Sequence, residues 1–278
     1  MTDPLASKRM IIGIGAQKAG TSWLHRQLAR HPHVFMSPIK ELHYFDAFFA
    51  SGVFQRFNTR LQDEFAQALQ DPPGAGAGLE WFECLADRVS MTNELDSYRD
   101  YFRKRVKAQH LVFGEITPSY AALDEAGFTA IRSVHSDIRL VFVLRDPVDR
   151  LISAMSVYNR RAGRTSNPLD VLAGLQRPDI VARCRYDLTL QRIDRAFDQE
   201  QVFVGFYEHM FAPRFSGALA GFLGMDSIGM DITERPNASP GKPISDTALI
   251  EELRRALAPV YDFCRERFGP ALPSSWRR

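Results

Sequence analysis

A glycine-containing loop between an apolar strand and an amphipathic helix is the feature that most constrains this chain. The segment IGAQKAGTSWLHRQLARHP spans residues 14–32. The apolar run Met10–Ala16, which contains β-branched residues, predicts a buried strand, and Thr21–His31 predicts a helix that Pro32 ends. Strand, loop and helix in this order form the first half of a βαβ unit, which favours an α/β fold.

Further apolar runs are expected to join the same sheet. They are Leu111–Phe113, Leu140–Leu144 and Val202–Phe206. Because helical patterns separate these runs, the sheet should be mostly parallel and covered on both faces. We therefore predict a P-loop-like α/β fold with about four or five strands, in a single domain of residues 1–278.

Helical patterns also cover residues 51–70, 93–107 and the C-terminal part of the chain. The Pro/Gly stretch DPPGAGAG at 71–78 is expected to be a flexible surface loop, or less often a lid over a site. Pro259 is expected to kink or interrupt the last helix. That helix carries an apolar stripe at Leu249, Leu253, Leu257, Tyr261, Cys264 and Phe268.

Composition excludes several classes of protein. A net charge of +2 is too small to indicate nucleic-acid binding by bulk electrostatics. Cys84, Cys184 and Cys264 are scattered and odd in number, which argues against a disulfide framework and a zinc site. The apolar stretch before Gln17 is too short for a signal peptide or a membrane span, so a reducing cytoplasm is the expected compartment.

The first loop differs from the phosphate loop of ATPases. That loop reads GxxxxGK[ST], whereas here Gly15 and Gly20 are kept, Lys18 lies inside the loop and Thr21 replaces the lysine. The amides that open the following helix can still hold an anion. Because no acidic strand end is paired with this loop, the sequence predicts an anion site without a metal.

A second anion site is predicted where a buried strand ends at Arg145. A guanidinium beside a helix N-terminus can grip a phosphate, and Asp146 can cap that helix. Ser153 is expected on its polar face, opposite Val148, Leu151, Ile152 and Met155 and together with Asp149, Ser156 and Arg160. Alternatively, Arg145 makes a structural ion pair and Ser153 is an ordinary polar-face residue.

The two segments together resemble those of sulfotransferases that use 3′-phosphoadenosine 5′-phosphosulfate (PAPS). QKAGTSWL at 17–24 resembles their 5′-phosphosulfate loop, and RDPVDRLISAMSVY at 145–158 their 3′-phosphate segment. KELHYFD at 40–46, GEITPSY at 114–120 and RPNASPGKP at 235–243 extend the resemblance over much of the chain. It is closest to heparan-sulfate-type and related bacterial enzymes.

The resemblance implies a cofactor site for PAPS and its product 3′-phosphoadenosine 5′-phosphate (PAP), without a metal. Arg145 and Ser153 would hold the 3′-phosphate, and a loop near 231–245 would close over the nucleotide, with Lys242 as a phosphate contact; an ordinary solvated lysine is the alternative there. The 5′-phosphosulfate would lie against Lys18, Ala19, Gly20, Thr21, Ser22 and Trp23.

The segment KELHYFD supplies the candidate bases for the acceptor proton. The resemblance places a catalytic glutamate at Glu41, which we rank ahead of His43. Burial among aromatic residues would raise the pKa of Glu41 toward neutrality, which suits a base. Alternatively, Glu41 only pairs with Lys40 or a loop amide, and His43 only packs in the core. Lys18 is the candidate for stabilising charge on the leaving phosphate.

One departure from the heparan-type pattern concerns the acceptor side. Ile116 stands where several of those enzymes have a lysine, so a second cation is missing or comes from Arg185, Lys242 or Lys40. In the same segment, Glu115 and Tyr120 either line the site or serve the structure.

The predicted activity is sulfuryl transfer from PAPS to a hydroxyl or amine of a carbohydrate or small metabolite, by a bacterial cytoplasmic enzyme without a membrane span or nucleic-acid partner. The first alternative is a P-loop kinase that uses ATP and magnesium. The second is a non-catalytic protein that binds adenosine phosphates or sulfated glycans. The acceptor and the oligomeric state stay open.

Overall fold

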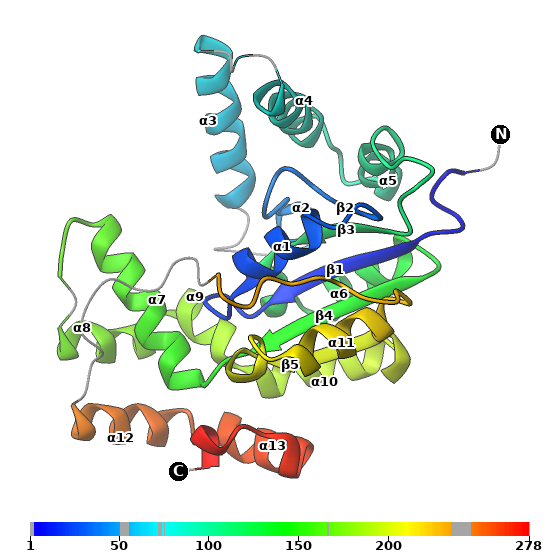
Figure 1. The fold of residues 1–278 in the computed structure, drawn as a ribbon. Helices are drawn as coiled ribbons and strands as arrows, with labels where there is room; N and C mark the ends of the chain where they lie inside the picture. Colours follow the sequence, from blue (N-terminus) through cyan, green and yellow to red (C-terminus); the bar gives the residue numbers. More distant parts are fainter. Residues whose placement is uncertain are drawn as a thin grey trace.

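The computed structural model describes residues 3–50, 56–71, 74, 76–165, 167–234 and 246–277. Among these residues, a five-stranded sheet has the order β2-β3-β1-β4-β5, with every neighbouring pair parallel (Figure 1). The strands are β1 (Arg9–Gly15), β2 (Val34–Met36), β3 (Val112–Ile116), β4 (Ile138–Leu144) and β5 (Val202–Phe206). The predicted α/β class with a parallel sheet is confirmed.

Helices cover both faces of the sheet, which explains why its central strands β1, β3 and β4 are buried along nearly their whole length. In Figure 1, α1 (Thr21–Ala29) and α11 (Pro213–Phe222) lie in front of the sheet, and α6 (Glu125–Ser133) and α10 (Tyr186–Ala196) lie behind it. The other α-helices of the described residues are α2 (Tyr44–Phe48), α3 (Arg56–Gln70), α4 (Ala77–Val89), α5 (Leu95–Arg103), α7 (Pro147–Arg161), α8 (Pro168–Ala173), α9 (Pro178–Val181), α12 (Thr247–Ala256) and α13 (Ala258–Phe268).

Several boundaries differ from those predicted. The predicted helix 51–70 is described from Arg56 on, and 51–55 lie outside the described residues. The helix expected at 93–107 is shorter, and α4 was not predicted at all; it begins inside the segment 71–78 that we expected to be a loop. As expected, the C-terminal helix is interrupted: α12 and α13 meet at Leu257, and Pro259 lies in the first turn of α13.

Asp146 joins α7 to the C-terminal helices. Its carboxylate accepts hydrogen bonds from the backbone N–H groups of Val148 and Asp149, at 3.0 and 3.2 Å, as the predicted cap. The same carboxylate accepts a 2.7 Å hydrogen bond from the hydroxyl of Tyr261 on α13. The cap that starts α7 therefore also fixes where α13 packs.

Tyr261→Phe should destabilise the protein measurably. A hydrogen bond to a charged group contributes about 1.5–3 kcal/mol, and Tyr261 is only 3% exposed. We expect a loss of that size in the free energy of unfolding, measured by urea denaturation. Tyr158→Phe is the control, because Tyr158 is 39% exposed and its ring is kept. Equal stability of the two variants would contradict the proposed role of this bond.

Candidate active site

A cleft of about 1190 Å³ opens at the carboxyl ends of the strands. Its walls include Lys18 after β1, Ser119 after β3, Arg145 after β4 and Tyr207 after β5. Such a position, where the loops of neighbouring parallel strands diverge, is the usual ligand site of an open α/β sheet. Of the predicted site residues, the cleft brings together Lys18, Gly20, Thr21, Ser22, Trp23, Glu41, His43, Arg145 and Ser153.

Among the described residues, one predicted cofactor residue does not line the cleft. Ala19 is 0% exposed and lies in the core behind the loop. Lys242 lies outside the described residues, as does most of the predicted covering loop. The described start of that loop packs on α1: the backbone N–H of Asp231 donates to Gln27, and the indole N–H of Trp23 donates to the carbonyl of Asp231 at 3.2 Å.

The turn between β1 and α1 has the shape of an anion cradle. Gly20 precedes α1 with φ 78°, in the left-handed region that favours glycine. A Cβ at Gly20 would lie 2.7 Å from the sulfur of Met210, so the turn leaves no room for a side chain there. The first amides of α1 therefore open directly onto the cleft, where the helix dipole favours negative charge.

Lys18 and Arg145 give this part of the cleft its positive charge. Arg145 donates a 2.9 Å hydrogen bond from Nη1 to the carbonyl of Lys18, and its guanidinium lies 4.8 Å from the ring centre of Tyr207. Burial lowers the pKa of Lys18, and the positive charges of Arg145, Arg160 and Arg161 lower it further. A bound anion would relieve that repulsion.

Ser153, predicted on the polar face of α7, is more buried than that prediction implies. It is 6% exposed and lines the cleft one turn of α7 before Val157, while Asp149 and Arg160 are exposed. The reason is that α7 is covered on more sides than its apolar stripe indicates: Arg150 is 0% exposed and donates to the carbonyl of Ile180. This inward position keeps Ser153 available to a ligand.

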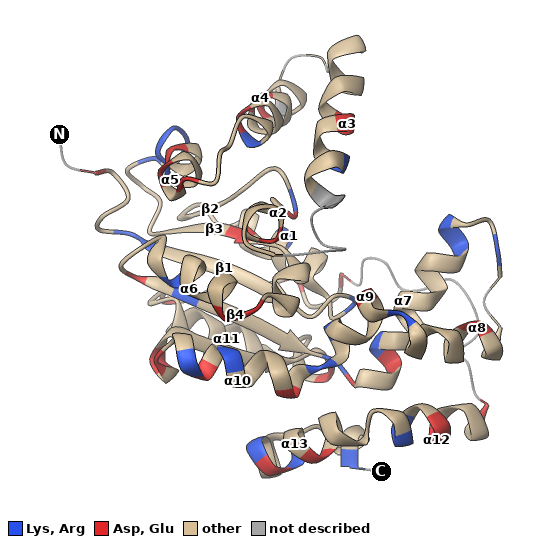
Figure 2. Ribbon diagram, turned by 180° about the vertical axis from the view of Figure 1, so that it is seen from behind, with Lys and Arg blue, Asp and Glu red and all other residues tan. Residues whose placement is uncertain are grey.

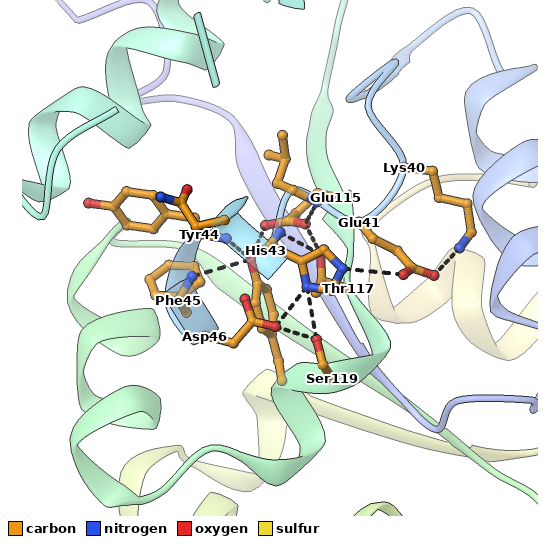
Figure 3. Close-up of polar contacts among 12 residues, drawn as sticks. Lys40, Glu41, His43, Tyr44, Phe45, Asp46, Glu115, Thr117 and Ser119 are labelled. Atoms are coloured by element: carbon orange, nitrogen blue, oxygen red, sulfur yellow. Dashed lines mark hydrogen bonds and ion pairs between the residues drawn. The ribbon is translucent and has the colours of Figure 1, made fainter. Parts of the chain in front are cut away.

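The two candidate bases lie side by side in the cleft wall, on the segment that precedes α2 (Figure 3). His43 Nε2 is 3.4 Å from Glu41 Oε2, and its Nδ1 is 2.7 Å from Asp46 Oδ2. Lys40 Nζ donates to Glu41 Oε1 at 2.5 Å. The hydroxyl of Ser119 donates to Asp46 and lies 3.1 Å from His43 Nδ1. One imidazole thus lies between two carboxylates.

The pKa of Glu41 differs from the one that we predicted. Burial acts to raise its pKa, but hydrogen bonds and charges from His43 and Lys40 outweigh burial and lower the pKa to about 2. The predicted shift toward neutrality is therefore wrong. Burial acts to lower the pKa of His43, yet its hydrogen bonds to Asp46 and Glu41 prevail, and the pKa of His43 is raised.

Three residues of the GEITPSY segment lie behind the site, whereas Pro118 and Ser119 of the same segment line the cleft. Ile116 is 1% exposed and belongs to the core, and Glu115 and Tyr120 are 0% exposed, so neither of the latter two lines the cleft. Of the cations considered as replacements, Lys40 lines the cleft, whereas Arg185 does not and pairs with Asp187 at 2.7 Å. Of these candidates, Lys40 is therefore the one that the described residues place in the cleft wall.

Sequence reasoning missed a second group of cations in the cleft wall, namely Arg60, Arg161, Arg177 and Arg183. They come from the start of α3, the end of α7 and the segment around α9, where Figure 2 shows Lys and Arg in blue. Arg177 lies over the ring of Tyr158 at 4.0 Å and pairs with Asp179. No local motif marks these residues, because the fold alone brings them together.

Within the described residues, no cluster of three or more His, Cys, Asp and Glu side chains is arranged to hold a metal ion. None of the helices in that part of the chain has the length and apolar character needed to cross a bilayer. The three cysteines are free and buried, as small core residues.

Comparison with known proteins connects this geometry to a family. A sequence model of the sulfotransferase family matches residues 10–214. No curated protein matches the sequence.

Among solved structures, a sulfotransferase from Alicyclobacillus acidocaldarius is 22% identical, with a TM-score of 0.64 over 98% of this chain and 100% of that one. A sulfotransferase domain from the curacin biosynthetic pathway is 14% identical (TM-score 0.53; 91% and 98% covered). A sulfotransferase domain of the Synechococcus PCC 7002 olefin synthase is 15% identical (TM-score 0.51; 96% and 95% covered). These likenesses show a shared fold.

Proposed function

Because this chain belongs to the sulfotransferase family, we propose that it transfers a sulfuryl group from PAPS to a hydroxyl or amine of a small molecule or carbohydrate. The observation that carries the proposal is the juxtaposition of two anion-binding elements in one cleft. Lys18 and the first turn of α1 form one element, and Arg145 and Ser153 form the other. A nucleotide with one phosphate on the 3′ position and another on the 5′ position of its ribose needs two such elements.

The residues present fit such a donor. The cradle at Gly20 admits backbone contact but no side chain, which suits a phosphate oxygen. Burial lowers the pKa of Lys18, and the neighbouring positive charges lower it further; such a surplus of positive charge suits an anion. PAPS would supply an activated sulfuryl group on its 5′-phosphate. Lys18 and the amides of Thr21 and Ser22 would hold that phosphate, while Arg145 and Ser153 would hold the 3′-phosphate.

In the proposed reaction, the acceptor oxygen or nitrogen forms a bond to sulfur while the bond from sulfur to the 5′-phosphate oxygen breaks. Lys18 stabilises the negative charge that develops on that oxygen. The acceptor loses one proton, and we propose that the pair Glu41–His43 accepts it. The pair can accept a proton only when the imidazole of His43 is neutral. Beside a charged His43, Glu41 has a pKa of about 2 and does not hold the proton.

The first test is isothermal titration calorimetry with PAP in the absence of metal. We expect micromolar binding in the wild type and a loss of about 10- to 150-fold in Arg145→Ala, the equivalent of one hydrogen bond to a charged group. Arg255→Ala is the control, because Arg255 is an exposed residue of α12. ATP with magnesium is titrated in parallel.

Three outcomes separate the candidate functions. Tighter binding of ATP with magnesium than of PAP would favour a kinase. An unchanged affinity in Arg145→Ala would contradict the assignment of the 3′-phosphate site. PAP binding without any conversion of PAPS to PAP, across a panel of hydroxyl and amine acceptors, would favour a non-catalytic protein.

A further inference from the structure

The segment Glu41–Phe45, which we call the base loop, has a backbone that needs external support. Glu41 has φ 67° and His43 has φ 53°, so two residues that are not glycine adopt the left-handed conformation within three positions. Each such residue costs about 1 kcal/mol relative to ordinary backbone. Contacts from the rest of the fold must therefore hold the base loop in this shape.

Glu115, at the end of β3, supplies one side of that support. Its carboxylate accepts hydrogen bonds from the hydroxyls of Tyr98 and Tyr120, at 2.9 and 2.8 Å, and from the hydroxyl of Thr117 at 2.5 Å. It also accepts a 3.1 Å hydrogen bond from the backbone N–H of Leu42, the residue between the two candidate bases. With four donors, the buried carboxylate is fully hydrogen-bonded.

Two of these hydroxyl groups extend the support along the base loop. Tyr120 Oη accepts from the backbone N–H of Tyr44 at 2.9 Å and lies 3.4 Å from that of Phe45. Thr117 Oγ1 lies 3.4 Å from the backbone N–H of His43. Figure 3 shows Glu115 and Thr117 beside the base loop. Each backbone N–H from Leu42 to Phe45 thus meets Glu115 or a hydroxyl that binds Glu115.

Arg88, on α4, supplies the other side. Its Nε donates to the carbonyl of Leu42 at 2.5 Å, and its Nη2 donates to the carbonyl of His43 at 2.8 Å. The third nitrogen, Nη1, donates to Asn58 on α3 at 3.2 Å. Arg88, a buried cation, therefore binds carbonyl groups of the base loop, and Glu115, a buried anion, lies on the side of its N–H groups.

We propose that Glu115 and Arg88 are positioning residues, which hold the base loop so that Glu41 and His43 face the cleft together. Both are 0% exposed and neither lines the cleft, so neither can touch a substrate. Glu115 and Arg88 affect the reaction by fixing the distances from His43 to Glu41 and from His43 to Asp46. The proposal rests on the proposed function only in assigning proton transfer to Glu41 and His43.

Two tyrosines provide a matched test. Tyr98 and Tyr120 each donate one hydrogen bond to Glu115, but only Tyr120 also binds the backbone of the base loop. Tyr98→Phe and Tyr120→Phe therefore remove the same bond to Glu115 and keep the same ring. We expect both variants to lose thermal stability, with the larger loss in Tyr120→Phe because it also loses the contacts with the loop backbone, and only Tyr120→Phe to disturb His43.

The readout is the titration of His43, followed by NMR in protein with ¹⁵N-labelled histidine and assigned with His43→Gln. The charged groups around this imidazole are Glu41 and Asp46, with Lys40 on Glu41 and Arg88 on the loop carbonyl. In Tyr120→Phe the pKa of His43 should fall toward its ordinary value of about 6.5, because contacts with the carboxylates loosen. Tyr98→Phe should keep the wild-type titration.

Glu115→Gln is the second variant, with Glu83→Gln on the exposed face of α4 as its control. A glutamine keeps the shape but turns one acceptor atom into a donor, so it should also lower the pKa of His43. An unchanged His43 titration in folded Tyr120→Phe and Glu115→Gln, or an equal shift in Tyr98→Phe, would overturn the proposal. PAP affinity, measured in parallel, should change less than about twofold, since the cofactor contacts are untouched. Failure of wild-type PAP binding would instead count against the proposed function.

Discussion

Lys18→Met should lower the rate of PAPS conversion to PAP by about 10²–10³-fold, the usual cost of removing one donor from a site of developing negative charge. Lys18 lines the cleft beside the N-terminus of α1, close enough to Arg145 for that cation to lower its pKa. In the transition state, charge grows on the 5′-phosphate oxygen, so a cation at this point stabilises the transition state more than the bound donor. PAP formation, followed by chromatography, is the measurement.

Substitution of Lys18 by methionine tests the charge of this side chain separately from the backbone conformation. Lys18 has φ 73°, and methionine is unbranched at Cβ as lysine is, so the backbone cost of this conformation stays the same. Lys107→Met is the matched control, because Lys107 is exposed and lies outside the cleft. A loss of less than about threefold in Lys18→Met, with normal folding, would remove Lys18 from the proposed chemistry.

The sequence was sufficient for the elements whose signal is local. The apolar runs of β1, β4 and β5 are long enough to be recognised, and the glycine turn before α1 fixes a strand, a loop and a helix at once. The strand β2 has only three residues and becomes a strand by pairing with β3, from Val34 opposite Val112 to Met36 opposite Gly114. Three residues carry no periodicity, so nothing in the sequence indicated this pairing.

The chemistry of the site was predictable in part, for a related reason. The glycine loop before α1 and Arg145 are marked by their neighbours in the chain, and the structure brings them into one cleft. The pKa of Glu41 depends instead on the orientation of His43 and Lys40, which follows from left-handed backbone that the sequence does not reveal. The contacts of Arg88 and Glu115 with the base loop join residues far apart in the chain, and such pairs leave no local pattern.

The plot of kcat/KM against pH should be bell-shaped. Deprotonation of His43 should cause the rise, and deprotonation of Lys18 should cause the fall. Below the pKa of His43 the imidazole is charged, and Glu41 with a pKa of about 2 cannot hold the acceptor proton. Because that His43 pKa is raised, the rise should lie above the ordinary value of about 6.5. At higher pH, Lys18, whose pKa is lowered, loses its charge and the rate falls. The value of kcat/KM reports the pKa values of the free enzyme, and the shifts of His43 and Lys18 described here apply to that state.

Asp46→Asn provides the sharpest test of this assignment. Asp46 is 0% exposed and its carboxylate accepts from His43 Nδ1, so it stabilises the charged imidazole. Removing that charge lowers the pKa of His43, and the rising side of the bell should move to lower pH while the falling side stays in place. His43→Gln should abolish the rising side and lower the maximal rate by about 10²–10⁴-fold, the usual contribution of a positioned base. A rising side that stays in place in Asp46→Asn and persists in His43→Gln would show that another group accepts the proton.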